Sequence, residues 1–406
     1  MDDYFNNDSA SSVTKLTILL LVVLSALSCR TIKIPPALNK LATDENWLQY
    51  GGAPARSNYY EKTIAPPLKT VWTYKASSAV NPTLVVADGV VYFGTMDGRF
   101  EAVRVATGEK IGRKNSEGHY DATLAYYDGN LFLASRYGDK TLAKYHLATG
   151  NFLWKIDAGD IASEPLVTAG GIYISALYNH IDKYDLNSGE RIWTFKTADQ
   201  HRSSPALSRN VLVVGCDNGV LYALDAQTGE LNWEIKTAAS IFATPVIQDE
   251  VIFVSSVDSN FYALDLIDGL VKWQFDAQTP LYQTAATDGK VVLFGASDGR
   301  FYCLDVESGE KKWQFQVSHA ISTAPVIAGD VVYFGSLDKN YYCLNLQTGQ
   351  KIWQQETRGR IRTSPVIWKN YVFGASEDKF VYAFRQADSG KRINSTRVEN
   401  YLYDDH

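Results

Sequence analysis

Cysteine and histidine are the side chains best suited to redox or metal chemistry, and in this sequence neither type is clustered. The cysteines are Cys29, Cys216, Cys303 and Cys343. No CxxC or CxxCH motif is present, which excludes zinc ribbons, thioredoxin-like redox pairs and covalently attached c-type haem. The six histidines show no metal-ligand spacing. We therefore expect no metal site.

Acid–base catalysis requires a pair of titratable groups held close together. Glu164 and Asp121 are the candidate carboxylates, because they fall in adjacent units of the repeat described below. No metal-ligating cluster accompanies them. We expect no catalytic residue in this chain.

Composition and charge indicate a globular protein that does not bind nucleic acid. The 406 residues are 46% hydrophobic and 21% charged, which is enough apolar material for a large core. The net charge is −6 and the isoelectric point is near 5.6. A nucleic-acid partner would require a basic face to neutralise phosphates, so we exclude that class.

The N-terminus reads as an export signal. Lys15 precedes an apolar run over 16–27, and twelve residues at 1.5 Å each are too few to span a bilayer core of about 30 Å. The run ends in Ala26-Leu27-Ser28-Cys29, which resembles a bacterial lipobox with Ala26 in place of the usual leucine. The resemblance implies that Cys29 is lipidated and becomes the mature N-terminus. The alternative is an ordinary secretory signal with a chance cysteine.

The first twelve residues are acidic, whereas a signal peptide begins with positive charge. We therefore expect translation to start at Val13.

A repeat of about 40 residues organises the rest of the chain. The phrase LYALDAQTGELNW at 221–233 returns in related form at 261, 301 and 341. A period of this length indicates a repeat architecture. A tryptophan follows the turn glycine by four residues in most repeats, and Gly112 takes that place once. The tryptophans of this column are Trp72, Trp154, Trp193, Trp233, Trp273, Trp313 and Trp353.

Each period contains four short apolar or alternating runs separated by Asp, Gly and Asn clusters, which is typical of four antiparallel strands joined by hairpins. Four such strands make one blade of a propeller. The pattern predicts an all-β, eight-bladed β-propeller. The last blade, at 360–385, lacks its own tryptophan strand, so the strand around Trp72 (69–75) is expected to complete it. The tryptophans are expected to pack between blades, with the indole N–H bonded to a backbone carbonyl.

The phrase A-L-D-x-x-T-G-x-x-x-W resembles the pyrroloquinoline-quinone-type repeat, and the opener NWLQYGGAPARSNYY at 46–60 resembles the lead-in of proteins with that repeat. WD40 propellers differ, because Trp is never followed by Asp here. Two branches share the repeat: quinoprotein dehydrogenases, and the BamB-like lipoproteins that act as scaffolds in outer-membrane protein assembly.

The quinoproteins would bring long insertions, an adjacent Cys-Cys pair and acidic calcium ligands. This chain has uniform repeats and no neighbouring cysteines, and Cys303 and Cys343 stand where Ala223 and Ala263 stand in other repeats. The resemblance to BamB therefore implies a non-catalytic scaffold with no cofactor, which binds a β-barrel assembly protein or another envelope protein.

Arg30 follows Cys29 at the position where an aspartate would retain an enterobacterial lipoprotein in the inner membrane. The resemblance therefore implies anchoring at the periplasmic face of the outer membrane. The alternatives are an oxidoreductase or ligand-binding propeller that uses a pyrroloquinoline quinone-like cofactor, and a small-ligand sensor.

The loops that lead into the inner strands should cluster at one mouth of the central channel. At this point of the repeat most residues are small or apolar, and the large polar or aromatic exceptions are the candidate partner-binding residues. They are Arg202, Arg362, Tyr282, Phe242 and His201. Arginine and aromatic residues are common interface anchors. The BamB family contacts its partner through a loop with leucine and arginine; the nearest loop here, TADQHRSSP at 197–205, has no leucine.

The expected organisation follows from these boundaries. It comprises a signal peptide at 1–28, a lipid-anchored linker at 29–45, a lead-in at 46–68, the propeller at 69–386 and a flexible tail at 387–406.

Overall fold

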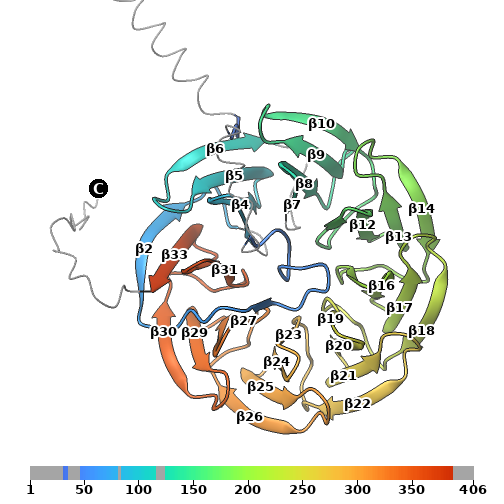
Figure 1. Cartoon of the computed structure of the whole chain (residues 1–406), viewed down its shortest axis with the longest axis vertical. Coiled ribbons are helices and arrows are strands. Elements are labelled where there is room, and N and C mark those ends of the chain that lie inside the picture. Colours follow the sequence, from blue (N-terminus) through green and yellow to red (C-terminus); the bar gives the residue numbers. More distant parts are fainter. Residues whose placement is uncertain (1–30, 35–45, 81–83, 116–123, 387–406) are drawn as a thin grey trace, which may run out of the picture.

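The computed structural model describes residues 31–34, 46–80, 84–115 and 124–386; the expected signal peptide, Cys29, Asp121 and the expected tail lie outside these ranges. The described residues form eight sheets arranged as a ring around a central axis (Figure 1), each with four antiparallel strands; one sheet has a short fifth strand that pairs in parallel. The predicted eight-bladed propeller is confirmed. Among the described residues, none forms a helix with the length and apolar character needed to cross a membrane.

The blades are numbered in chain order, and each runs from its inner strand to its outer strand. Blade 1 contains β3 (Val85–Ala87), β4 (Val90–Thr95), β5 (Arg99–Arg104) and β6 (Lys110–Asn115). Blade 2 contains β7 (Ala125–Tyr127), β8 (Asn130–Ala134), β9 (Leu142–His146) and β10 (Asn151–Ile156). Blade 3 contains β11 (Leu166–Thr168), β12 (Gly171–Ala176), β13 (His180–Tyr184) and β14 (Arg191–Lys196). Blade 4 contains β15 (Ala206–Ser208), β16 (Val211–Gly215), β17 (Val220–Asp225) and β18 (Leu231–Lys236).

The second half of the ring repeats this plan. Blade 5 contains β19 (Val246–Gln248), β20 (Val251–Ser255), β21 (Asn260–Asp265) and β22 (Val271–Asp276). Blade 6 contains β23 (Ala286–Thr287), β24 (Val291–Gly295), β25 (Arg300–Asp305) and β26 (Lys311–Gln316). Blade 7 contains β27 (Val326–Ala328), β28 (Val331–Gly335), β29 (Asn340–Asn345) and β30 (Lys351–Glu356), and β1 (Tyr59–Tyr60) pairs in parallel with β27. Blade 8 contains β31 (Val366–Trp368), β32 (Tyr371–Ala375) and β33 (Phe380–Gln386).

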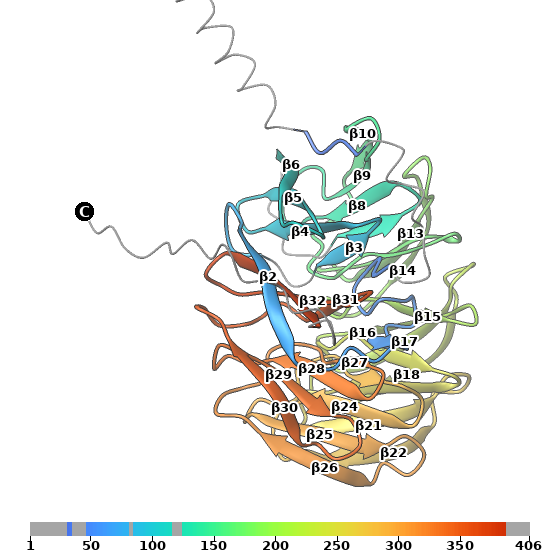
Figure 2. The same ribbon diagram turned by 60° about the vertical axis from the view of Figure 1, so that its left-hand side comes forward.

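The ring is closed as predicted. The outer strand of blade 8 is β2 (Leu68–Lys75), which comes from the other end of the propeller sequence and pairs antiparallel with β33, with Trp72 opposite Ala383. Figures 1 and 2 show this strand in light blue beside the red strands of blade 8. This pairing covers the outer edge of β33 and joins the two ends of the propeller sequence in one blade.

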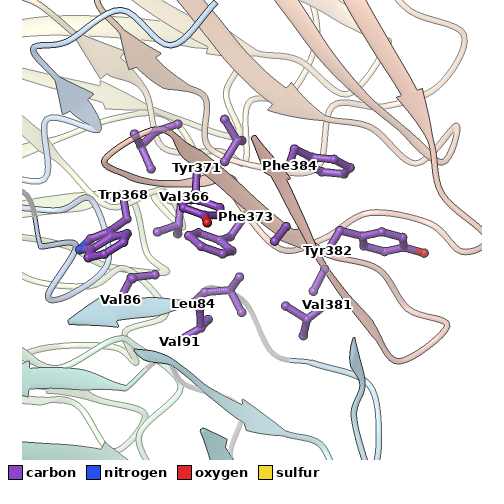
Figure 3. Packing of buried hydrophobic residues seen from close by; sticks show 14 of the residues in the cluster. Leu84, Val86, Val91, Val366, Trp368, Tyr371, Phe373, Val381, Tyr382 and Phe384 are labelled. Carbon is purple, nitrogen blue, oxygen red and sulfur yellow. The ribbon is translucent and has the colours of Figure 1, made fainter. Parts of the chain in front are cut away.

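Burial follows the position of a strand within its blade. Every residue of β16 is buried, whereas the outer strand β18 alternates exposed and half-buried residues. Inner strands meet neighbouring blades on both faces, which is why their sequences are continuous apolar runs. Figure 3 shows one such junction, where Trp368 and Phe373 of blade 8 pack with Val86 and Val91 of blade 1.

The tryptophan and glycine columns of the repeat meet in space. The indole of Trp233 lies on Gly269 in the turn of the next blade, so closely that a Cβ on Gly269 would be 2.6 Å from the ring. The indole N–H donates to the Leu266 carbonyl at 3.1 Å. The same N–H to carbonyl bond is made by Trp72, Trp193, Trp273 and Trp313. The turn glycine is therefore required twice, for its positive φ and for the space above it.

Two members of the column deviate. The N–H of Trp154 has no partner among the described residues, and the carbonyl of Leu186, which stands where the other tryptophans find their acceptor, takes a bond from Lys144 Nζ at 3.0 Å. Trp353 packs edge-on against Tyr333 and Phe384.

Gly112 leaves a gap between blades 1 and 2, and an N-terminal segment fills it. Ile32 and Ile34 are fully buried there, and a Cβ on Gly112 would be 2.7 Å from the Thr31 carbonyl oxygen. The Ile34 N–H donates to the Leu147 carbonyl at 3.0 Å, the acceptor that a tryptophan would otherwise use. Part of the expected 29–45 linker is thus docked on the ring.

The lead-in segment crosses the axis of the ring (Figure 1). Between Trp47 and Asn58 it accepts hydrogen bonds from backbone N–H groups of seven inner strands in the described chain. The donors are Val86, Tyr126, Val167, Leu207, Ile247, Thr287 and Ile327. Each blade so contacted offers the same unpaired inner-edge N–H, which explains why one extended segment can bond to seven blades in turn.

Candidate partner-binding surface

The loops that enter the inner strands lie on one face of the ring, together with the hairpins between the second and third strands of each blade. This follows from the antiparallel order, because the hairpin after each inner strand and the turn before each outer strand must lie on the other face. We call the first face the ladder face, after the side chains described next. Ion pairs between the two kinds of loop, such as Arg202 Nε to Asp217 Oδ2 at 3.3 Å, confirm their proximity.

Three of the predicted residues form a continuous ladder across blades 4, 5 and 6. The Arg202 guanidinium carbon lies 4.9 Å from the ring centre of Phe242. Phe242 in turn stacks on Tyr282, with ring centres 6.0 Å apart and planes within 10° of parallel. Arg202 and Tyr282 are exposed, and Phe242 is half-buried between them. We call Arg202, Phe242 and Tyr282 the aromatic ladder.

The ladder exists because one column of the repeat carries large side chains in three successive blades. Successive positions are 40 residues apart, and the ring brings equivalent atoms of neighbouring blades within stacking distance. A cation–π contact at an exposed site contributes about 0.5–1 kcal/mol, so the ladder is held weakly and remains available to a partner. Burial raises the pKa of Asp217, and the positive charge of Arg202 opposes that rise.

Arg362 stands apart from the ladder. It occupies the same column in blade 8, but Ser322 of blade 7 separates it from Tyr282, and its Nε donates to Glu377 Oε1. Arg202 and Arg362 are each paired with a carboxylate fifteen residues later in the chain. The side chain of Arg362 is 58% exposed, so it is an isolated exposed ion pair on the same face.

His201 does not belong to this surface, and our expectation for it needs correction. The side chain is fully buried; Nδ1 lies 2.8 Å from the Gly215 carbonyl and Nε2 lies 2.8 Å from Thr197 Oγ1. Burial lowers its pKa to about 4. The reason is that its column is a core position in most blades: Ser78 is half-buried, but the five aliphatic equivalents are all buried. They are Ile161, Ile241, Leu281, Ile321 and Ile361. That run of aliphatic residues was the sequence signal that could have identified the column as buried.

A belt of hydroxyl groups fixes the loops beneath the ladder. The backbone N–H of Glu164 donates to Ser204 Oγ at 2.8 Å, and that of Ser204 to Thr244 Oγ1 at 3.3 Å. The Thr244 N–H continues the series to Thr284 Oγ1 at 3.0 Å. Each bond joins one blade to the next. The loops that carry the ladder are therefore braced by neighbouring blades, which makes the surface rigid.

Glu164 is hydrogen-bonded to the loop of the next blade. Its carboxylate accepts a hydrogen bond from Ser204 Oγ. Beside it at the axis lies Arg56, which is fully buried and donates to the carbonyls of Tyr50 and Pro205 at 2.5 and 3.0 Å. Burial lowers the pKa of Arg56 to about 10, and the negative charge of Glu164 opposes this effect. Nothing in the local sequence distinguishes Arg56 from a surface arginine, so its buried position could not be predicted.

The thiols are placed as buried small residues. Cys303 and Cys343 are fully buried and form no disulfide, and burial raises the pKa of each thiol to about 12. A group that remains protonated is a poor nucleophile and a poor ligand. Over the described residues, no three His, Cys, Asp or Glu side chains are placed to hold a metal ion.

Comparisons with known proteins agree with the fold and the repeat. The family model described as outer membrane protein assembly factor BamB matches residues 177–396, a little over half of the chain. BamB from Moraxella catarrhalis is similar in structure, with 20% identity and a TM-score of 0.68 over 78% of this chain and 99% of that one. No curated protein sequence matches the chain.

Quinoproteins share the fold as well. A europium-containing methanol dehydrogenase has 13% identity and a TM-score of 0.74 over 86% of this chain and 100% of that one. A quinohemoprotein alcohol dehydrogenase from Pseudomonas putida HK5 has 14% identity and a TM-score of 0.74 over 91% and 84% of the two chains. At these identities the structural similarity establishes the propeller fold and does not establish an activity.

Proposed function

The chain belongs to the family of the outer membrane protein assembly factor BamB, and we propose from this that it is a non-catalytic scaffold that binds a protein of the β-barrel assembly machinery at the cell envelope. The observation that carries the proposal is the aromatic ladder. It places one arginine and two aromatic rings, partly exposed, on a braced face, at a position where three other repeats have the small residues Ala79, Ala162 and Ser322. Interface hot spots are rich in these residue types.

The mechanism we propose is architectural. The closed ring holds the ladder loops in fixed positions, so a partner pays little ordering cost on the scaffold side when it binds. Tyr282 and Phe242 offer flat apolar surface, and Arg202 offers a cation already oriented by Asp217. A partner with an apolar side chain beside a carboxylate fits this arrangement. The exposed edges of the outer strands offer a second mode, in which a client strand pairs with a blade.

The oxidoreductase alternative has less support from the geometry. The lead-in occupies the axis where a channel cofactor would have to lie, and the buried guanidinium of Arg56 bonds to carbonyl groups from two blades there. Glu164 and the described cysteines are bonded or protonated rather than poised for chemistry. These features support a role in which the axis is structural.

The test is purification of the tagged, full-length protein from its own membranes in mild detergent, with mass spectrometry of the proteins that accompany it. We expect a β-barrel protein with periplasmic domains. The triple variant Arg202→Ala, Phe242→Ala, Tyr282→Ala should reduce its recovery by at least about tenfold, which is the effect of one hot-spot residue or more.

The matched control removes apolar surface from the opposite face. Ile267, Leu270 and Val271 of blade 5 are exposed by 60, 67 and 51%, and their triple alanine variant should retain the partner. Equal recovery with both triple variants would refute the ladder as the docking site. A protein purified with a bound quinone, and with oxidoreductase activity on added quinone and calcium, would refute the scaffold itself.

A further inference from the structure

The N-terminal segment docks at one point on the rim of the ring, and this point bears on how the ring is oriented relative to a membrane. Thr31–Ile34 lies at the outer edge of the ring in the gap between blades 1 and 2, where Figure 1 shows it as a short blue segment near β6 and β9, and Figure 2 shows it reaching β10. Tyr145 Oη donates to the Ile32 carbonyl at 2.7 Å, which adds to the Ile34 bond described above. The chain therefore leaves the ring at a defined point rather than from a loose linker.

Cys29 is two residues before Thr31, and two residues span at most about 7 Å. If Cys29 carries a lipid, as the sequence predicts, the tether between the lipid and Thr31 is only two residues long. A lipid on Cys29 would bring this part of the rim, and not the flat faces of the ring, next to the bilayer.

The outer strands on both sides of the docked segment are basic. The strands β2 and β6 carry Lys69, Lys75, Lys110, Arg113 and Lys114, and no acidic residue. The strands β10 and β14 add Lys155, Arg191 and Lys196, again without an acid. These four outer strands belong to blades 8, 1, 2 and 3, and the gap that holds Thr31–Ile34 lies at the middle of this half of the ring.

The outer strands in the other half of the ring carry both basic and acidic residues. Outer strands β18, β22, β26 and β30 carry five lysines and three acids, namely Glu234, Asp276 and Glu356. Two of those lysines are also neutralised from the adjacent strands β21 and β25, since Lys272 and Lys312 pair with Asp265 and Asp305 at 2.8 and 2.9 Å. The first half also has acidic neighbours, because Arg191 lies 3.9 Å from Asp182, and the exposed turn residues Glu109 and Glu190 adjoin β6 and β14. In a chain with a net charge of −6, eight cations and no acid within four outer strands still form a distinct basic edge.

We propose that this basic edge, the outer strands of blades 8, 1, 2 and 3 around the docked Thr31–Ile34 segment, is a membrane-binding surface that contacts anionic phospholipid headgroups. Each lysine or arginine near an anionic bilayer strengthens binding about fivefold. The ring then stands with this edge on the membrane, and the ladder face points sideways, free to meet a membrane-embedded partner. The inference concerns orientation and does not rest on the proposed partner surface.

The test uses the full-length protein reconstituted into vesicles of phosphatidylethanolamine with one quarter phosphatidylglycerol, and into vesicles in which phosphatidylcholine replaces the phosphatidylglycerol. A fluorophore is attached at Lys110→Cys on blade 1 or at Lys311→Cys on blade 6. Both lysines are exposed and occupy the same position of the repeat, so they form a matched pair. The described native cysteines are buried, and the unsubstituted chain labelled in parallel serves as the blank for Cys29.

Quenching by brominated lipids reports which label lies near the bilayer. We expect quenching at position 110 to exceed that at 311 by at least about twofold in the anionic vesicles, and the excess to fall when Lys75→Glu and Lys114→Glu are introduced. The control pair Lys312→Glu and Lys351→Glu should leave it unchanged. Equal quenching at the two positions would overturn the proposal, as would an excess that depends neither on phosphatidylglycerol nor on the basic edge.

Discussion

The contact between each tryptophan and the glycine of the next blade predicts a large difference between two chemically identical substitutions. Gly89 and Gly269 have nearly the same backbone conformation, with φ of +77° and +73°. A Cβ on Gly89 would meet no heavy atom within 4 Å, whereas a Cβ on Gly269 would lie 2.6 Å from Trp233. Alanine at the two positions therefore separates the conformational cost from the cost of displacing the indole.

The magnitudes follow from these two contributions. An alanine held in the left-handed region costs about 1–2 kcal/mol, and Gly89→Ala should lose about that amount. Gly269→Ala incurs the same cost plus about 1–3 kcal/mol for overpacking against the indole. If Trp233 moves away, its bond to the Leu266 carbonyl is lost as well, at about 1 kcal/mol. We expect Gly269→Ala to be less stable than Gly89→Ala by about 2–4 kcal/mol.

The assay is equilibrium unfolding in urea, followed by circular dichroism, for both variants and for each combined with Trp233→Ala. In the Trp233→Ala background the extra cost of Gly269→Ala should disappear, while the cost of Gly89→Ala should persist. Equal losses at Gly89 and Gly269, or an extra cost that survives removal of the indole, would refute the interlock between the two columns.

Three further predictions concern buried polar groups. His201 is neutral when buried, because its pKa is about 4 in the folded chain against 6.5 in the unfolded chain. Its contribution to stability is therefore complete above pH 6.5 and is lost as the pH falls towards 4, by up to about 3 kcal/mol. Thermal melts should show a smaller loss of stability between pH 7 and pH 5 for His201→Ile than for the unsubstituted chain, and an equal loss would contradict the burial of a neutral histidine. Arg56→Met leaves the carbonyls that Arg56 bonds without a donor and should cost about 3–5 kcal/mol in urea unfolding, whereas exposed Arg209→Met should cost less than about 0.5 kcal/mol. The buried thiols should not react with an aromatic disulfide reagent at pH 8 until urea is added. Fast reaction of the folded protein that Cys29→Ser abolishes would come from a free Cys29. Fast reaction that persists in Cys29→Ser would come from a buried thiol and would contradict this prediction. These buried thiols are Cys216, Cys303 and Cys343.

The repeat predicted the ring because its columns are dictated by local rules. A turn needs glycine at a positive φ, and an inner strand needs an apolar run. Trp72 occupies the tryptophan column although no blade precedes it, and this predicted a closing strand at 69–75, one residue from the start of β2 at Leu68. Each of these signals is visible in a short stretch of sequence and is reinforced by its recurrence in other repeats.

The features that the sequence analysis missed depend on contacts between distant segments. Arg56 looks like any loop arginine until the fold places it beside Glu164, Pro165 and Pro205. The docking of Thr31–Ile34 depends on a gap left by Gly112, some eighty residues later. His201 was assigned to the surface on its polarity, although the aliphatic residues at its equivalents pointed to the core.

The central claim is that a protein of the envelope assembly machinery docks on the aromatic ladder, and photo-crosslinking in living cells tests it most directly. A photo-reactive phenylalanine analogue would replace Tyr282 on the ladder face or Ile267 on the opposite face, which are exposed by 44 and 60%. We predict that irradiation links position 282, and not position 267, to a β-barrel protein that carries periplasmic domains. An adduct formed only from position 267, or no protein adduct from position 282, would contradict the account.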